Sequence, residues 1–224
     1  MLGGFSIKQY LMRFARLMAG LFLFALGIVF TLRANIGYAP WDVFHAGLAG
    51  TLGITIGLAS ILVGLALLVV VAAMKETLGL GTVFNMIFVG AFIDLILAVR
   101  VIPLAEGYVV GLFMLTSGLA LIAFASYLYI SSAFGAGPRD SLMIILACKT
   151  GKPVGVCRAG VELTAVVIGF FLGGQVGVGT VVAAFGIGFF VQLVFRLMKF
   201  DAATVKHESL AQSFRVFLNL FKSK

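Results

Sequence analysis

Apolar side chains dominate six long stretches of the chain, and these stretches predict its architecture. Each is roughly 17–25 residues long, the length of α-helix that crosses a bilayer core of about 30 Å. Polar or glycine-containing segments separate them. The pattern therefore predicts an all-α polytopic membrane protein. Its six expected spans are Leu11–Leu32, Ile56–Met74, Leu80–Val99, Tyr108–Ile130, Val156–Leu172 and Gly177–Leu197.

The composition supports a membrane environment. Of the 224 residues, 62% are hydrophobic and only 11% are charged, whereas soluble domains average about 45–50% apolar and about 25% charged residues. A water-soluble core could not bury so much apolar surface. We therefore expect the lipid bilayer to be the principal partner of the chain.

The basic residues predict an orientation, because cytoplasmic loops accumulate Lys and Arg. With the N-terminus inside, every one of the 16 Lys and Arg residues falls on the inner side except Arg33 and Arg100. Both termini are then cytoplasmic. This asymmetry also accounts for the formal charge of +8, so we expect no nucleic-acid partner.

An internal repeat divides the spans into two groups of three. Gly37–Asp42 recurs as Gly135–Asp140, and the same shift of 98 positions aligns Gly81–Val83 with Gly179–Val181. Matches in glycine, proline and threonine, held in one register across whole helices, indicate duplication. Because each copy holds an odd number of spans, the second copy must cross the membrane inverted. Such repeats are typical of transporters.

The repeats form one transmembrane domain over residues 1–200, with the first copy at about 10–102 and the second at about 108–200. Residues 201–224 follow it, and basic residues surround one apolar helical stripe in this segment. The segment predicts an amphipathic helix on the cytoplasmic leaflet. The stripe consists of Leu210, Phe214, Phe217 and Phe221.

Two short apolar segments begin at Pro40 and Pro138 and continue to Ala49 and Ala147. Proline suits the first turn of a helix, and each segment carries Asp two positions later, where it complements the positive helix end. The segments are too short to span a bilayer. One interpretation is a capped surface helix. The other is a pair of re-entrant half-helices that enter from opposite faces and converge on one site.

These motifs resemble the YczE/YitT-type family of bacterial inner-membrane proteins, and the YczE branch most. The resemblance covers roughly residues 15–199 and implies a multi-span inner-membrane protein of a kind regarded as a transporter, without a defined substrate. It rests on Gly37–Val43, Gly79–Asn85, Gly137–Asp140, Arg158, Glu162 and Gly177–Thr180.

Polar side chains within and beside the spans define a candidate substrate site, because each is costly in hydrocarbon. We expect one site near the middle of the bilayer, between the repeats. Its charges are mixed, which suits a zwitterion or a small organic anion. The candidate residues are Trp41, Asp42, Asn85, Asp94, Arg139, Asp140, Arg158, Glu162 and Gln192, with Pro40 and Pro138 starting the half-helices.

Several of these residues have a second interpretation. Arg158 and Glu162 are four positions apart and are expected to pair, either as a structural clamp or with Glu162 as a proton-coupling group. Asp94 is five residues from the end of its span and could instead reach toward water. Trp41 suits either an anchor at the headgroups or a wall of the site.

The sequence carries no recognised catalytic motif, so we expect no enzymatic activity. Its cysteines, Cys148 and Cys157, and its histidines, His45 and His207, lack the spacing of metal ligands, and we expect neither a metal nor a cofactor. Three functions stay open: a secondary transporter or facilitator of a small polar solute, a substrate-binding subunit of an ATP-driven importer, or an accessory membrane protein. A second copy of the chain is a candidate partner in each case.

Overall fold

The computed structural model describes residues 7–74, 78–135, 137–205 and 207–213, and over these residues it is helical without any strand. Six helices are long and apolar enough to cross a membrane, while α2 and α6 have 13 residues each. The helices are α1 (Ile7–Arg33), α2 (Pro40–Leu52), α3 (Ile56–Ala73), α4 (Leu80–Val99), α5 (Tyr108–Ser131), α6 (Pro138–Thr150), α7 (Val154–Phe171) and α8 (Val178–Leu197), followed by a 3-10 turn at Ala202–Thr204.

The six predicted spans are confirmed as helices, with ends within a few residues of those expected. The two short helices are also present and begin at the expected prolines, but they extend further than predicted, to Leu52 and Thr150. Each ends at a glycine in the left-handed conformation, Gly53 (φ 66°) and Gly151 (φ 68°). Glycine adopts this conformation without steric cost and commonly terminates helices.

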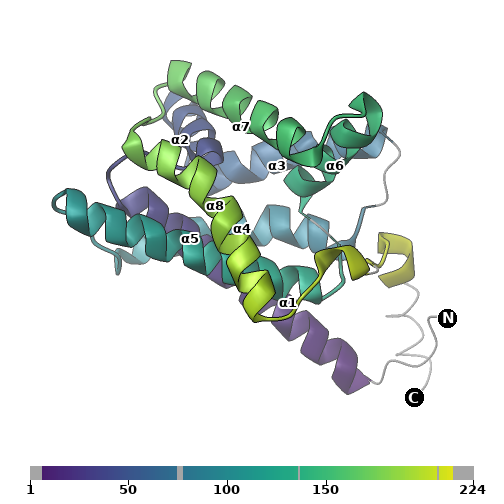
Figure 1. Ribbon diagram of the computed structural model, residues 1–224. Helices are drawn as coiled ribbons and strands as arrows, with labels where there is room; N and C mark the ends of the chain where they lie inside the picture. The colour runs from purple at the N-terminus through teal and green to yellow at the C-terminus, as the bar shows by residue number, and fades with distance from the viewer. Residues whose placement is uncertain (1–6, 75–77, 136, 206, 214–224) are drawn as a thin grey trace.

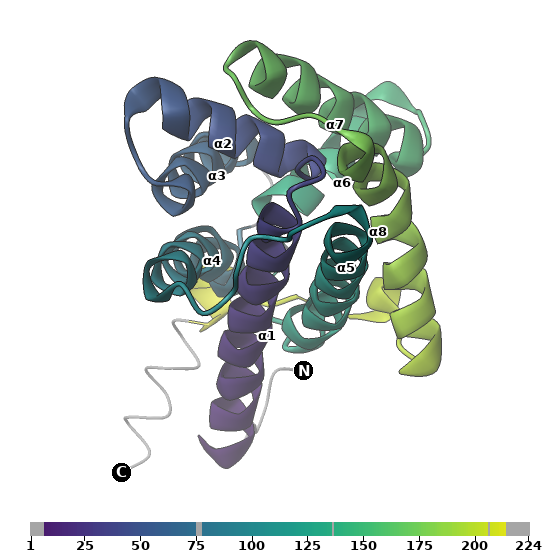
Figure 2. The same ribbon diagram turned by 90° about the vertical axis from the view of Figure 1, so that its left-hand side faces the viewer.

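Helices α1 and α5 form the centre of the fold and run antiparallel side by side (Figures 1 and 2). They cross closely at Gly27 and Gly118, where a Cβ added to either glycine would lie within 2.8 Å of the carbonyl oxygen of the other. Small residues at the crossing let two backbones approach, which is a principal source of helix association in lipid. The glycines therefore set the spacing of the central pair.

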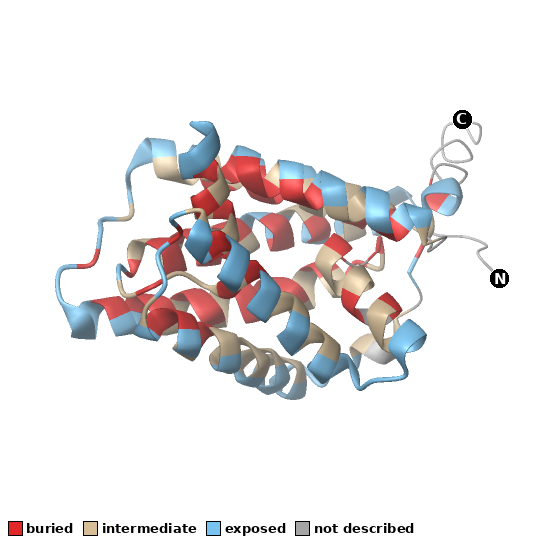
Figure 3. Ribbon diagram, turned by 90° about the horizontal axis from the view of Figure 1, so that it is seen from above, coloured by how far each residue is buried: buried red, intermediate tan, exposed pale blue. Residues whose placement is uncertain are grey.

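The other helices surround this pair. Helix α4 packs on α1, α8 packs on α5, and α2 packs on both α3 and α7. Helix α6 packs on α3 and α7, with Met143 and Ile145 buried in the interior of the bundle and residues 148–150 exposed. Buried positions face this interior, and exposed positions face outward along the long helices (Figure 3). The outward positions include many large apolar side chains, as expected for helices in contact with lipid.

Helix bounds and contacts repeat at the shift of 98 found in the sequence. Adding 98 to the bounds of α2, α3 and α4 gives the bounds of α6, α7 and α8. The amide of Gly81 donates to the carbonyl of Phe134 at 2.8 Å, and the amide of Gly179 donates to that of Ile36 at 2.7 Å. In each of these two hydrogen bonds, the amide comes from one half of the chain and the carbonyl from the other half.

The two halves differ in one helix pair. Helix α3 packs on α4 where Gly57 faces Gly90, so closely that a Cβ on either would overlap the other's backbone oxygen. The corresponding helices α7 and α8 do not pack together. A Cβ at Gly155 or Gly188, the equivalent positions, would meet no atom within 4 Å. The bundle is therefore tightly packed between α3 and α4 and more loosely packed between α7 and α8.

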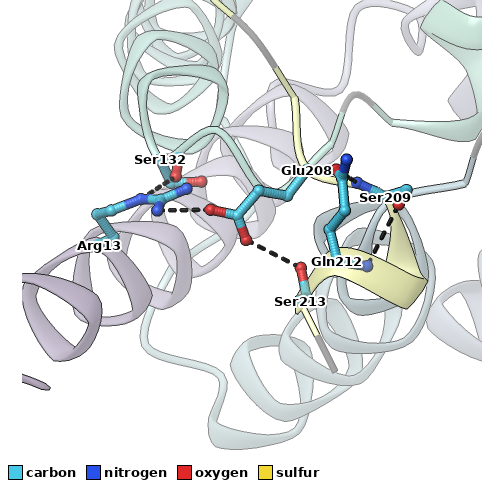
Figure 4. Close-up of polar contacts among 6 residues, drawn as sticks. All are labelled: Arg13, Ser132, Glu208, Ser209, Gln212 and Ser213. Atoms are coloured by element: carbon cyan, nitrogen blue, oxygen red, sulfur yellow. Dashed lines mark hydrogen bonds and ion pairs between the residues drawn. The ribbon is translucent and has the colours of Figure 1, made fainter. Parts of the chain in front are cut away.

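A segment after α8 returns to the helix ends near the start of α1. The carboxylate of Glu208 forms an ion pair with Arg13 at 2.6 Å and accepts a hydrogen bond from the hydroxyl of Ser213 at 3.1 Å (Figure 4). The Nε of Arg13 also donates to the carbonyl of Ser132 at 3.0 Å. These contacts join the segment to α1 and to the end of α5.

Half of the predicted amphipathic helix of residues 201–224 lies outside the described residues, since residues 206 and 214–224 are not among them. Its described part makes backbone bonds to the bundle: the amide of Glu208 donates to Ala133, and that of Leu210 donates to Leu78, both at 2.9 Å. Residues 207–213 are thus attached near the start of α4 and the end of α5.

Candidate functional site

The site is built around the first turns of α2 and α6. Pro40 and Pro138 occupy the first helical position, after an extended N-cap residue, where a missing N–H costs nothing. The N-terminus of a helix carries roughly half a positive charge. Residues of both first turns line a common cavity, so the positive ends of the two helices lie beside it.

A cavity of about 120 Å³ lies beside the start of α2. Its polar lining brings together most of the residues that the sequence singled out, from three helices. Apolar side chains of α1, α5 and α8 complete the wall, among them Phe24, Ile122 and Ile187. The polar lining consists of Trp41, Asp42, Arg139, Asp140, Arg158 and Glu162.

A second cavity of about 70 Å³ lies on the other side of Arg139 and Asp140, which line both. Asn85 of α4 and Ser60 of α3 contribute polar atoms to it. Pro138 also lines this smaller cavity. The first turn of α6 therefore separates two compartments, and Arg139 and Asp140 form the boundary.

Arg139 is held against α2 by two contacts. Its guanidinium lies over the ring of Trp41, with 4.6 Å from Cζ to the ring centroid, a favourable cation–π arrangement. Its Nη2 lies 3.1 Å from Nε2 of His45, a fully buried side chain. Trp41 also lines the larger cavity.

Asp140 is held by α5. The hydroxyl of Tyr129 donates to the Asp140 carboxylate at 2.6 Å. Asp42, by contrast, faces along its own helix, with Oδ1 3.5 Å from Nδ1 of His45. The two equivalent aspartates therefore have different partners, and a single ligand would meet two different half-sites.

The predicted pair of Arg158 and Glu162 is confirmed, with 2.8 Å between Nε and Oε1. The carboxylate is the more buried of the two, since the Glu162 side chain is 12% exposed and that of Arg158 is 39% exposed. Both line the larger cavity. The pairing satisfies both interpretations of Glu162, as a clamp and as a titrating group.

Two predicted residues lie elsewhere. Asp94 lines neither cavity; its carboxylate accepts from the hydroxyl of Thr55 at 2.5 Å and from the amide of Gly57 at 2.8 Å. It therefore caps the start of α3. Gln192 is exposed on α8 and also lines neither cavity, because its helix turns that face outward.

His45 and Tyr129 are polar residues at the site that sequence reasoning missed. His45 follows Asp42 by three positions, so helical periodicity places both on one face, and this signal was available in the sequence. Tyr129 lies in an apolar span without any motif around it. Its role depends on α5 passing the start of α6, which no local pattern reveals.

Comparison with known proteins assigns the family. Residues 11–196 match the model of a family of unknown function, DUF6198. The chain is 34% identical over 180 residues to the uncharacterized membrane protein YczE of Bacillus subtilis, covering 79% of this chain and 82% of that protein. The chain belongs to this YczE-like family.

Other YczE-like relatives give the same picture. An uncharacterized protein of Haemophilus influenzae is 34% identical over 184 residues, covering 78% of this chain and 84% of the relative. The uncharacterized protein YyaS of Bacillus subtilis is 27% identical over 166 residues, covering 72% and 81%. No solved structure matches the chain. Family membership and the six apolar helices establish a multi-pass membrane protein in contact with lipid.

Proposed function

We propose that this protein is a secondary transporter or facilitator that moves a small zwitterion or organic anion across the bacterial inner membrane. The observation that carries the proposal is the meeting of two helix N-termini with Arg139 at one cavity. Helix N-termini and arginine both favour a carboxylate or another anion. Discontinuous helices place their N-termini at anionic substrate groups in known transporters.

The balance of charges argues for a ligand of mixed or negative charge. Arg139 and Arg158 and the two helix starts oppose the carboxylates of Asp42, Asp140 and Glu162 around the larger cavity. A divalent cation would favour carboxylates without neighbouring arginines. The cavity, of about 120 Å³, suits a small solute.

The proposal includes an inverted repeat with α2 and α6 as re-entrant half-helices. The shared bounds at a shift of 98 and the reciprocal bonds of Gly81 and Gly179 support it. The distribution of Lys and Arg supports cytoplasmic termini. In this arrangement, α2 and α6 enter from opposite faces and meet at the site.

Flux into proteoliposomes tests the function. The probes are labelled glycine, alanine, lactate and acetate, the smallest zwitterions and carboxylates. We expect the wild type to transport at least one of them, and R139Q to transport it at least tenfold more slowly. R196Q is the matched control, because Arg196 is exposed near the end of α8.

The other functions give different results. A substrate-binding subunit of an ATP-driven importer would bind a probe without flux when reconstituted alone. An accessory protein would neither bind nor transport, and a D42N/D140N variant would keep its activity. Flux that is equal in the wild type and in R139Q would contradict the assignment of the site.

A further inference from the structure

The contact between Arg139 and His45 fixes the protonation state of the histidine. An arginine guanidinium has only N–H donors and no acceptor. For the 3.1 Å contact to be a hydrogen bond, Nε2 of His45 must accept it. His45 is therefore neutral, with its proton on Nδ1, the atom that lies 3.5 Å from Oδ1 of Asp42.

Protonation of His45 is incompatible with this contact. A second proton on Nε2 would place an N–H of His45 against an N–H of Arg139, with like charges on both groups. Asp42 is already beside Nδ1 and would compensate the charge of the imidazolium. Arg139, which lines both cavities, would leave the ring and enter the space beside it.

We propose that His45 is the proton-binding residue of a proton-coupled transporter. Neutral His45 holds Arg139 on α2, and protonated His45 releases Arg139 to bind the carboxylate of the solute. This inference rests on the proposed transport function for its biological role, but the protonation-dependent contact can be measured without any solute. It assigns coupling to His45 in place of Glu162.

The surroundings of His45 contain several other charged groups. Asp42 shares its helix, Arg139 and Asp140 come from α6, and Arg158 and Glu162 from α7 line the adjoining cavity. Tyr129 of α5 donates to Asp140, and α8 contributes the apolar Ala183 and Ile187. Glu162 already has Arg158 as its ion-pair partner at 2.8 Å. Among these ionisable groups of the described residues, His45 is the one that lies within hydrogen-bond distance of Arg139, the arginine that lines both cavities.

The coupling between proton binding and solute binding follows from thermodynamic linkage. If protonation of His45 makes Arg139 available, binding of an anion to Arg139 must favour protonation of His45 to the same degree. Proton and anion then bind together, and an inward proton gradient drives uptake. Typical couplings change affinity by about 5–150-fold, so we expect solute affinity to rise at least fivefold between pH 8 and pH 5.

The only tryptophan of the chain reports on the contact. Trp41 lies under Arg139, and its ring centroid is 6.3 Å from that of His45. Its fluorescence, recorded in nanodiscs from pH 8 to pH 5, should show one transition in the wild type and none in H45Q. H207Q is the matched control, because His207 is the only other histidine and lies in the segment after α8. H207Q and E162Q should keep the transition.

A second measurement does not depend on the folding of H45Q. In H207Q the only histidine is His45, so carbon and nitrogen shifts of labelled histidine describe it alone. We expect the neutral form with the proton on Nδ1 at pH 8, converting to imidazolium over the same range as the fluorescence change. Neutral His45 throughout this range, or a transition of Trp41 that persists in H45Q, would overturn the inference.

Flux separates coupling from transport itself. H45Q should lose the stimulation of flux by an inward proton gradient, whereas the control H207Q should keep it. Loss of stimulation in E162Q alone would assign coupling to Glu162 and refute our proposal. Absence of flux in every form, including the wild type, would reject the transport function, and the spectroscopic titrations would still decide the protonation of His45.

Discussion

Asp94 of α4 accepts a hydrogen bond from the amide of Gly57 at the first turn of α3, at 2.8 Å. The same carboxylate accepts from Thr55, the N-cap residue of α3, so one side chain satisfies two groups at a helix start. The equivalent position in the second half holds Gln192, which is exposed, and there α7 and α8 do not pack. Asp94 is therefore part of the tightly packed helix pair, and the more loosely packed pair has no equivalent contact among the described residues.

Replacing Asp94 by Asn should destabilise the protein. Asn keeps one acceptor oxygen but cannot accept from both Thr55 and Gly57 as a carboxylate does, and we expect a loss of about 1–2 kcal/mol in the free energy of unfolding. Thermal unfolding in detergent micelles measures it. Q192N is the control and should change stability by no more than about 0.5 kcal/mol. Equal effects of the two substitutions would contradict the capping role.

The crossing of α1 and α5 predicts a strong effect of a single methyl group. In G27A the new Cβ would lie 2.7 Å from Cγ1 of Ile122 and 2.8 Å from the carbonyl of Gly118, so the helices must separate. Overpacking of this kind costs about 1–3 kcal/mol. Gly160 of α7 has open space beside it, and G160A should leave stability unchanged or raise it. Similar melting temperatures for the two variants would show that α1 and α5 can separate at the crossing without a loss of stability.

The contact between Arg13 and Glu208 predicts non-additive substitutions. Both side chains are largely buried, at 15% and 5% exposed, and removing one partner of a buried pair costs about 3–5 kcal/mol. R13M and E208M should each be strongly destabilising, while the double variant should lose less than the sum of the two. Thermal unfolding of the four proteins completes the cycle. Strict additivity would show that the pair contributes no coupling.

The orientation of the chain is tested by cysteine labelling. In a C148S/C157S background, single cysteines replace Tyr38 and Lys152. We expect a membrane-impermeant maleimide to label position 38 from outside the cell and position 152 only after the membrane is permeabilised. Labelling of both positions from the same side would reject the inverted repeat.

The spans could be predicted from the sequence because their cause is local. A run of apolar residues of sufficient length has one stable state in a bilayer, so the ends of α3 and α4 were predicted to within a residue. The starts of α2 and α6 could be predicted for the same reason, since the proline in each sequence favours the first turn of a helix. The ends of α2 and α6 were predicted less accurately, because both helices continue up to a glycine in the left-handed conformation, Gly53 or Gly151.

The site was harder to predict because its meaning depends on which helices meet. Asp94 and Glu162 look alike in the sequence, as single carboxyl groups within apolar spans. Packing makes Asp94 a cap for α3 and leaves Glu162 beside the cavity. His45 is an ordinary helical residue until α6 brings Arg139 within 3.1 Å of it. Contacts between helices decide such roles, and the hydropathy pattern does not reveal which helices will be in contact.

The reciprocal bonds between the halves have a consequence for synthesis. The carbonyl of Ile36 bonds with the amide of Gly179, which leaves the ribosome more than a hundred residues later. The larger cavity likewise needs Ala183 and Ile187 from the last span for its wall. Chains are made from the N-terminus and fold in that order. The first half is therefore synthesised well before the donor for the Ile36 carbonyl, and the larger cavity cannot be complete until α8 has been made.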